Sequence, residues 1–357
     1  MASGGVSGYA AISARVRAMY SSLLGASDFA RLSEAPDFPS LIGQLKQTAY
    51  GPYLESLKDK DLTPRKVDLQ IKGRLADSYY SVIYAAPGHT RSLLKQLYRY
   101  FEVGNLKAVL RGIVTDPTWD HVREVLFPLG SLTVLPAQAM VEAGSLGSAV
   151  ELLKNTVYDE TLSFAMKRYS SEQNLFPLEV ALDLSYWRQL WREAKRLQGL
   201  DRDQALRIIG SLMDMNNLMW VIRYRVYHDL SEEELINYTL PFGYHVRDED
   251  IRAIAAGVDI ASVVERVYPT LSEVEALLAE PRSGLPQLEI KLKRHVMKQC
   301  LAAFSGNPFH IGIPLAFLIL SDLEIQDLTV LIEAKSSRVP EEDFRPFLLR
   351  TIAAKAN

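Results

Sequence analysis

The sequence predicts an all-α protein built from three similar helical domains. Helix-start and helix-end signals recur along most of the 357 residues, whereas alternating apolar and polar runs of strand length are scarce, residues 131–135 being the nearest case. Two sequence patterns also recur three times with a period of about 110 residues. That period is typical of a small domain and is too long for a solenoid repeat, which indicates domain triplication.

The expected helices follow one another along the chain. Thr63 is an N-cap residue and Pro64 suits the first helical position, so a helix is expected from there to about Ala86. Thr90 and Asp201 are the expected caps of two long helices that end near Val114 and His228. Further boundaries are expected at a capping box in residues 231–234, at Asp248 or Asp250, at Gly257 as a helix end, and at Pro314 and Pro340 as helix starts.

The first repeated pattern combines an acid, an Asn-Leu or Asp-Leu pair and two aliphatic residues at fixed offsets. Its copies are residues 102–111, 214–223 and 324–333, which lie 112 and 110 residues apart. The acids are Glu102, Asp214 and Glu324, and Asn105, Asn217 and Asp327 follow three residues after them. The third copy departs from the others, because it has Asp where they have Asn.

The second repeated pattern ends in a tyrosine, and its three tyrosines are Tyr50, Tyr158 and Tyr268. They lie 108 and 110 residues apart, so both patterns share one period. We therefore expect a disordered leader over residues 1–8 and three helical repeat domains over residues 9–115, 116–230 and 231–357. On superposition, the three tyrosines are expected to coincide.

Composition excludes several functional classes. Lys and Arg total 40 against 43 Asp and Glu, a net charge of −3, so the basic excess of a nucleic-acid-binding protein is missing. Cys300 is the one cysteine, which excludes an intrachain disulfide and a cysteine-based zinc site. The six histidines are scattered, and neither a phosphate-binding loop nor a nucleophile elbow occurs. We expect no metal, no cofactor, no membrane span and no secretory signal.

The repeated acids invite two interpretations. On a helix, Glu102 falls on the same side as the apolar residues that follow it, and Asp214 and Glu324 do the same in their copies. Such acids could be catalytic, or they could accept hydrogen bonds or pair with basic side chains. The second interpretation is favoured because each acid lies about 110 residues from the next and nothing in the sequence brings them together.

Several segments resemble the C subunit of V/A-type rotary ATPases, which is the counterpart of the d subunit in the eukaryotic vacuolar enzyme. Residues 14–17, 23–24, 41–50 and 105–111 are similar to the first domain of that family. Residues 314–332 and 339–342 are similar to its last domain. The resemblance extends from about Tyr9 to Leu349.

The resemblance implies a non-catalytic protein of the central rotor. Three helical domains would stand around a pseudo-threefold axis and form a funnel, whose wide end receives the shaft made of the D and F subunits. The narrow end would rest on the cytoplasmic face of the membrane proteolipid ring, so that the protein is peripheral to the membrane. The protein would transmit torque between ATP hydrolysis or ATP synthesis and the transport of H⁺ or Na⁺.

Three residues are candidates for the contact with the shaft. Arg111 and Arg223 occupy equivalent positions opposite the apolar face of their helices, and Glu333 reverses the charge at that position in the third copy. A ring that repeats one surface gives no reason for one domain to differ, whereas matching an asymmetric shaft does. Two alternatives remain open: a helical scaffold without a rotary role, and an α-helical enzyme that uses acidic residues.

Overall fold

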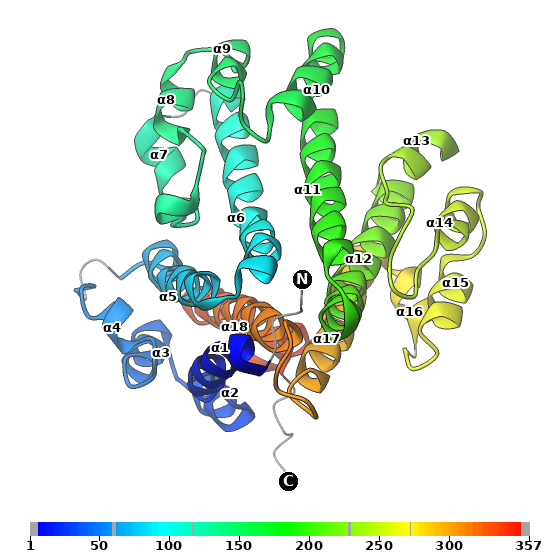
Figure 1. Cartoon of the computed structure of the whole chain (residues 1–357). Helices are drawn as coiled ribbons and strands as arrows, with labels where there is room; N and C mark the ends of the chain where they lie inside the picture. Colours follow the sequence, from blue (N-terminus) through cyan, green and yellow to red (C-terminus); the bar gives the residue numbers. More distant parts are fainter. Residues whose placement is uncertain (1–5, 59–61, 116–117, 228–229, 272, 351–357) are drawn as a thin grey trace.

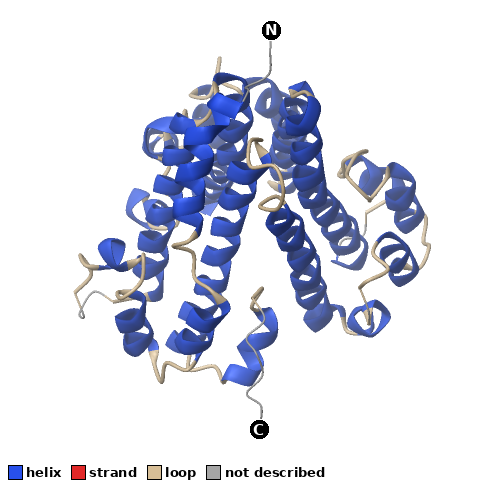
Figure 2. Ribbon diagram, turned by 60° about the horizontal axis from the view of Figure 1, so that its bottom comes forward, coloured by secondary structure: helices blue, strands red, loops and turns tan. Residues whose placement is uncertain are grey.

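The protein is all-helical, as the sequence predicts. The computed structural model describes residues 6–58, 62–115, 118–227, 230–271 and 273–350, and this part of the chain contains helices, turns and loops but no strand (Figure 2). The nearest sequence candidate for a strand, residues 131–135, forms a 3₁₀ turn over Gly130–Leu132 and then extended backbone. None of the described helices has the length and apolar character needed to cross a membrane.

Six long helices of the described chain form a closed ring. They are α5 (Pro64–Ala85), α6 (Gly88–Thr115), α11 (Phe176–Arg196), α12 (Gly199–Tyr227), α17 (Pro281–Ala302) and α18 (Gly312–Ser336). Each packs against the next in this order, and α18 packs against α5 to close the ring. Figure 1 shows the pairs α6–α11, α12–α17 and α18–α5 spreading outward from a common centre.

Short helices pack on the outer parts of these pairs. In the N-terminal segment these are α1 (Val6–Tyr20), α2 (Ala26–Ser33), α3 (Phe38–Leu45) and α4 (Gly51–Leu54). Between α6 and α11 lie α7 (Trp119–Arg123), α8 (Ala137–Glu142), α9 (Leu146–Glu151) and α10 (Asp159–Glu172). Between α12 and α17 lie α13 (Glu232–Asn237), α14 (Asp248–Ala255), α15 (Ile260–Val267) and α16 (Val274–Ala279), and the C-terminal segment carries α19 (Glu341–Phe344) and a 3₁₀ turn over Arg345–Phe347.

The packing of the short helices repeats around the ring. Helices α7 to α9 pack on α6, and α13 and α14 pack on α12, so each group covers the long helix that precedes it. Helix α18 is covered by α19 but also by α1 and α3 from the N-terminal segment. Beside α6 and α12, the covering helices come from the chain that follows each long helix. Beside α18, the N-terminal segment occupies the corresponding place. The pseudo-threefold relation itself stays a prediction.

Several expected helix boundaries are confirmed. The hydroxyl of Thr63 accepts a hydrogen bond from the Lys66 amide at 3.3 Å and caps α5. Ser231 and Glu234 form the expected capping box of α13. Residues 299–321, which contain no Asp, Glu, Lys or Arg, comprise the end of α17, a turn and the start of α18.

Other boundaries differ for local reasons. Helix α6 begins at Gly88, so Thr90 lies in its first turn and its hydroxyl donates to the Pro87 carbonyl. Asp201 also lies inside its helix, because α12 begins at Gly199 and the Asp201 carboxylate accepts hydrogen bonds from distant segments instead. At α14 the N-cap is Arg247, whose amide donates to the Asp250 carboxylate.

Three further expected boundaries can be compared with the structure. Helix α18 begins at Gly312, two residues before the proline expected to mark its start. Helix α12 is described to Tyr227, and the expected end at His228 lies outside the described residues. Helix α1 begins at Val6, so residues 6–8 of the expected leader are helical, whereas residues 1–5 lie outside the described part.

Candidate functional site

Each repeated tyrosine binds a repeated acid. The tyrosine hydroxyls donate to the acids over 2.6 Å for Tyr158 and Glu102, 3.3 Å for Tyr268 and Asp214, and 2.7 Å for Tyr50 and Glu324. All six side chains are buried. In each pair the tyrosine and the acid belong to different predicted domains, so these hydrogen bonds connect all three domains. The domain boundaries themselves stay a prediction.

Glu102 anchors the loop that follows α7. Its Oε1 atom accepts hydrogen bonds from the hydroxyl of Thr133 at 2.7 Å and from the amide of Val134 at 2.6 Å. Its Oε2 atom accepts from Tyr158, and Arg99 lies 3.5 Å from the same oxygen. The carboxylate therefore fastens two separate parts of the segment 119–172 to α6.

Asp214 does the same through backbone donors. Its carboxylate accepts hydrogen bonds from the amides of Tyr244, His245 and Val246 at 2.7 to 3.1 Å, in addition to the Tyr268 hydroxyl. Burial raises the pKa of Asp214, and the three amides oppose that rise because they stabilise the charged form. The acid thus holds the loop before α14 against α12.

Glu324, the third repeated acid, has partners from both ends of the chain. Its Oε2 atom accepts from the Leu24 amide at 2.7 Å, and Arg350 lies 3.4 Å away. Its Oε1 atom accepts from Tyr50 and from Arg74, the latter at 3.2 Å. Burial raises the pKa of Glu324 against the opposing effects of Arg350, Tyr50 and Arg74. The second interpretation of the acids, as hydrogen-bond acceptors and ion-pair partners, fits these contacts.

The repeated amides bridge the backbone in the same way twice. Asn105 donates from Nδ2 to the Phe127 carbonyl at 2.9 Å and accepts from the Phe127 amide at 2.7 Å. Asn217 makes the equivalent pair of bonds with Leu240, both at 2.9 Å. An asparagine suits this position because it offers one donor and one acceptor to a single peptide unit.

Asp327 replaces the amide with an acceptor, and two arginines compensate. Its Oδ1 atom accepts from the Leu349 amide at 2.6 Å, but a carboxylate has no hydrogen to give to the Leu349 carbonyl. That carbonyl accepts instead from Nε of Arg294 at 3.2 Å. Arg350 lies 3.1 Å from Oδ2 and balances the charge. The departure seen in the sequence thus preserves the anchoring contact with different donors.

The three candidate shaft residues lie near the C-terminal ends of α6, α12 and α18. Arg111 forms a bidentate pair with Glu179 of α11 at 2.5 and 2.7 Å, although its side chain remains 58% exposed. Arg223 pairs with Glu289 of α17. Glu333 is exposed, and the structure gives its carboxylate no ion pair with another described residue. Both arginines therefore connect neighbouring long helices, which sequence reasoning did not predict.

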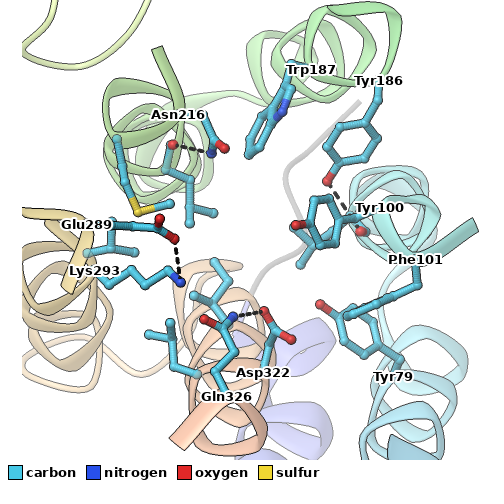
Figure 3. Close-up of a pocket in the computed structure, with 16 residues that line it drawn as sticks. Tyr79, Tyr100, Phe101, Tyr186, Trp187, Asn216, Glu289, Lys293, Asp322 and Gln326 are labelled. Atoms are coloured by element: carbon cyan, nitrogen blue, oxygen red, sulfur yellow. Dashed lines mark hydrogen bonds and ion pairs between the residues drawn. The ribbon is translucent and has the colours of Figure 1, made fainter. Parts of the chain in front are cut away.

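The six long helices enclose a central cavity of about 390 Å³. Every one of them contributes to its lining, and Figure 3 shows the polar side chains of α17 and α18 facing the aromatic rings of α5, α6 and α11. The ten labelled residues are Tyr79, Tyr100, Phe101, Tyr186, Trp187, Asn216, Glu289, Lys293, Asp322 and Gln326. The sequence offered one signal for this site, namely an acid close to an apolar run. Asp322 stands two residues after the apolar residues 311–320.

Charges in the central cavity are unevenly compensated. Lys293 binds Glu289 at 2.7 Å. Although burial opposes the effect, Lys293 and Arg223 hold the pKa of Glu289 below its usual value. Asp322 accepts one hydrogen bond from Gln326 at 3.0 Å, and burial raises its pKa to about 6. In the described chain no group of three or more His, Cys, Asp or Glu residues is arranged to hold a metal ion.

Comparisons with known proteins give a consistent result. Residues 12–347 match the family model described as ATP synthase (C/AC39) subunit. The C subunit of the A-type ATP synthase of Methanocaldococcus jannaschii is 24% identical over 96% of this chain and 86% of that protein. The same protein of Archaeoglobus fulgidus is 24% identical over 94% of each chain. That of Methanosphaera stadtmanae is 23% identical over 94% of this chain and 86% of that protein.

Proposed function

This chain belongs to the ATP synthase (C/AC39) subunit family, and on that premise we propose that it couples the central shaft of the D and F subunits to the membrane proteolipid ring. As a member of that family it is a structural part of an A-type ATP synthase, not a catalytic one. The proposed role is to transmit torque between ATP chemistry and ion transport, from a peripheral position on the cytoplasmic side of the membrane.

The closed ring of helices is the observation that supports this role most. A torque-transmitting part must resist twisting, and the contact of α18 with α5 joins elements about 250 residues apart in the sequence. The buried acids fasten the short helices to this ring through hydrogen bonds. A ring of long helices that is closed in this way meets the mechanical requirement.

Reconstitution tests the coupling directly. The purified chain is expected to bind a complex of the D and F subunits, and separately to sediment with liposomes that carry the proteolipid ring. It is not expected to sediment with bare anionic liposomes, because the described chain has no span and its net charge is −3. Binding to neither the shaft nor the ring would leave a scaffold without a rotary role as the better description.

We further propose that Arg111, Arg223 and Glu333 contribute to the shaft contact. They lie at matching positions of the repeated pattern on α6, α12 and α18, and the third reverses the charge. Reversing each charge singly is expected to weaken binding to the D and F subunits by a few-fold and to increase its salt sensitivity, with ring binding unchanged.

The internal ion pair of Arg111 demands a matched control. The double variant Arg111→Glu with Glu179→Arg restores the contact between α6 and α11 while the charge at position 111 stays reversed. If this double variant binds the D and F subunits as tightly as the original chain, Arg111 serves the contact between helices and not the shaft.

A further inference from the structure

The central cavity contains an acid without a cationic partner. Asp322 projects from α18 into the cavity, where its carboxylate accepts a side-chain hydrogen bond from Gln326 at 3.0 Å (Figure 3). The nearby cation Lys293 is bound to Glu289 at 2.7 Å. No described residue forms an ion pair with Asp322. A carboxylate in such a place loses hydration without gaining a counter-ion.

The rest of the lining suits an organic cation. The rings of Tyr79, Tyr100, Phe101 and Trp187 face the same space, and aromatic faces attract ammonium and guanidinium groups. Tyr100 of α6 is 50% exposed, and its hydroxyl points into the cavity (Figure 3). The volume of about 390 Å³ lies within the usual range for small-molecule sites.

We propose that the central cavity binds an organic cation, a primary ammonium or a guanidinium group, with Asp322 as its counter-ion. Two sources share this chemistry: a free small cation, or a Lys or Arg side chain of a partner protein. The site lies within a single chain and does not depend on the proposed coupling function, so the two proposals can fail separately.

The groups around Asp322 set the expected pH dependence. Gln326 lies on the same helix, Glu289 and Lys293 face it from α17, and the tyrosines face it from α5, α6 and α11. Lys72 of α5 and Lys293 act on it electrostatically. Because a cation requires the charged form of the acid, whose pKa is about 6, affinity is expected to increase as the pH rises through that value.

Titration of the full chain with n-butylammonium and with ethylguanidinium, followed by ligand-observed NMR at pH 7.5, tests the site. Binding at millimolar concentration is expected, and Asp322→Asn should weaken it by about tenfold or more. Asp203→Asn is the matched control, since Asp203 is exposed on α12 and lies outside the cavity lining. Equal affinity in Asp322→Asn, or no binding by the original chain, overturns the proposal.

Two further measurements separate the sources and guard against misfolding. If assembly with partner proteins abolishes binding of the probes, a partner side chain occupies the site; if binding persists, the ligand is a free cation. Tyr100→Leu keeps an apolar side chain but removes the aromatic face, and it is expected to weaken binding several-fold. Unaltered affinity in this second variant contradicts the proposed aromatic contribution and with it the site as described.

Discussion

At the scale of single residues, the buried acids stabilise the fold because donors converge on them from segments far away in the sequence. Asp214 receives three backbone amides, which satisfy its charge without an ion pair to a cation. Glu102 and Glu324 combine amide, hydroxyl and arginine donors. Hydrogen bonds to charged acceptors are stronger than neutral ones, which explains how short helices with little core of their own stay in place.

The unequal donor sets predict unequal effects of removing the tyrosine hydroxyls. Tyr158→Phe is expected to lower the free energy of unfolding by about 1.5–3 kcal/mol, because a short charge-assisted bond to Glu102 is lost. Tyr268→Phe should cost clearly less, because its bond to Asp214 is long and three amides remain. Urea unfolding of both variants measures the difference; equal losses would mean that the distances do not reflect bond strength.

Asp322 provides a pH-dependent prediction. Its folded pKa of about 6 exceeds the usual value of 3.8, so between these values the folded state binds more protons than the unfolded state. The contribution of this group to stability therefore decreases as the pH rises from about 4 to about 6. Asp322→Asn should be close to the original chain in stability near pH 4, and more stable above pH 6.5 by at most about 3 kcal/mol.

Thermal unfolding across pH 4 to 8 measures this divergence. Asp203→Asn again serves as the control, because an exposed acid should give a difference that hardly changes with pH. A constant difference between Asp322→Asn and the original chain would contradict the desolvation of Asp322.

At this scale the sequence predicted the positions but not the partners. The helical period placed Glu102 on the apolar face, and Glu102 is indeed buried. Its donors, Thr133 and Val134, lie in a loop whose path depends on tertiary packing, so no pattern within α6 could reveal them. The compensation for Asp327 was equally invisible, since Arg294 and Arg350 lie 33 and 23 residues away in the sequence.

At the scale of helices, the contacts within the pairs α6–α11 and α18–α5 use different side chains. Helices α6 and α11 are joined by Arg111 with Glu179 and by Lys107 with Asp183, the latter at 2.7 Å. Between α18 and α5, the Thr329 hydroxyl donates to Asp68 instead. Glu333 therefore lies where α18 packs against α5, and there the contact is made by Thr329 and Asp68 and not by an arginine at position 333.

Charge exchange at the first of these contacts tests its contribution. Arg111→Glu brings two carboxylates together and is expected to destabilise the protein by about 0.5–1 kcal/mol at low salt, since the arginine is largely exposed. Adding Glu179→Arg should recover most of that loss. A double-mutant cycle at low salt and at high salt measures the coupling, and a coupling energy near zero at low salt would mean that the pair is merely adjacent.

Helix boundaries show why sequence reasoning succeeded at some positions only. Thr63 and Ser231 cap their helices because each is followed by a local partner three residues later. Asp201 has the right residue type, but its carboxylate accepts from the Tyr9 hydroxyl and the Ile311 amide, both at 2.8 Å. The Asp201 carboxylate therefore makes long-range hydrogen bonds in place of the helix cap that its residue type predicts.

At the scale of the whole molecule, the closed ring depends on contacts between the two ends of the chain. Ser13 donates to the Pro308 carbonyl at 2.6 Å, and Arg74 reaches Glu324 across 250 positions in the sequence. The period of the repeat predicted three units but not this closure. An internal repeat indicates that segments have similar structures. It does not indicate which neighbour each segment packs against, and ring closure depends on that.

The described core is divided into two clusters, and this division predicts two steps of opening. The smaller cluster contains the C-terminal half of α12 with α14 to α17, including Ile254 and Val264. Helices α14 to α16 have 8, 8 and 6 residues, lengths that are marginal without tertiary contacts. By contrast, 18 of the 25 residues of α18 are buried. Amides of α14 to α16 are therefore expected to exchange through a partial opening, at lower free energy than those of α18.

Hydrogen exchange measured by mass spectrometry at increasing urea concentration resolves these steps. Ile254→Ala should lower the opening free energy of α14 to α16 by about 2–5 kcal/mol and leave exchange in α18 nearly unchanged. Leu318→Ala, in the larger cluster, should instead accelerate exchange in both regions, because the ring must unfold as a unit. If Ile254→Ala accelerates both regions equally, the two clusters open together and the whole molecule is a single cooperative unit. Independent opening would place the stiffness of the protein in the ring of long helices and leave α14 to α16 as its compliant part.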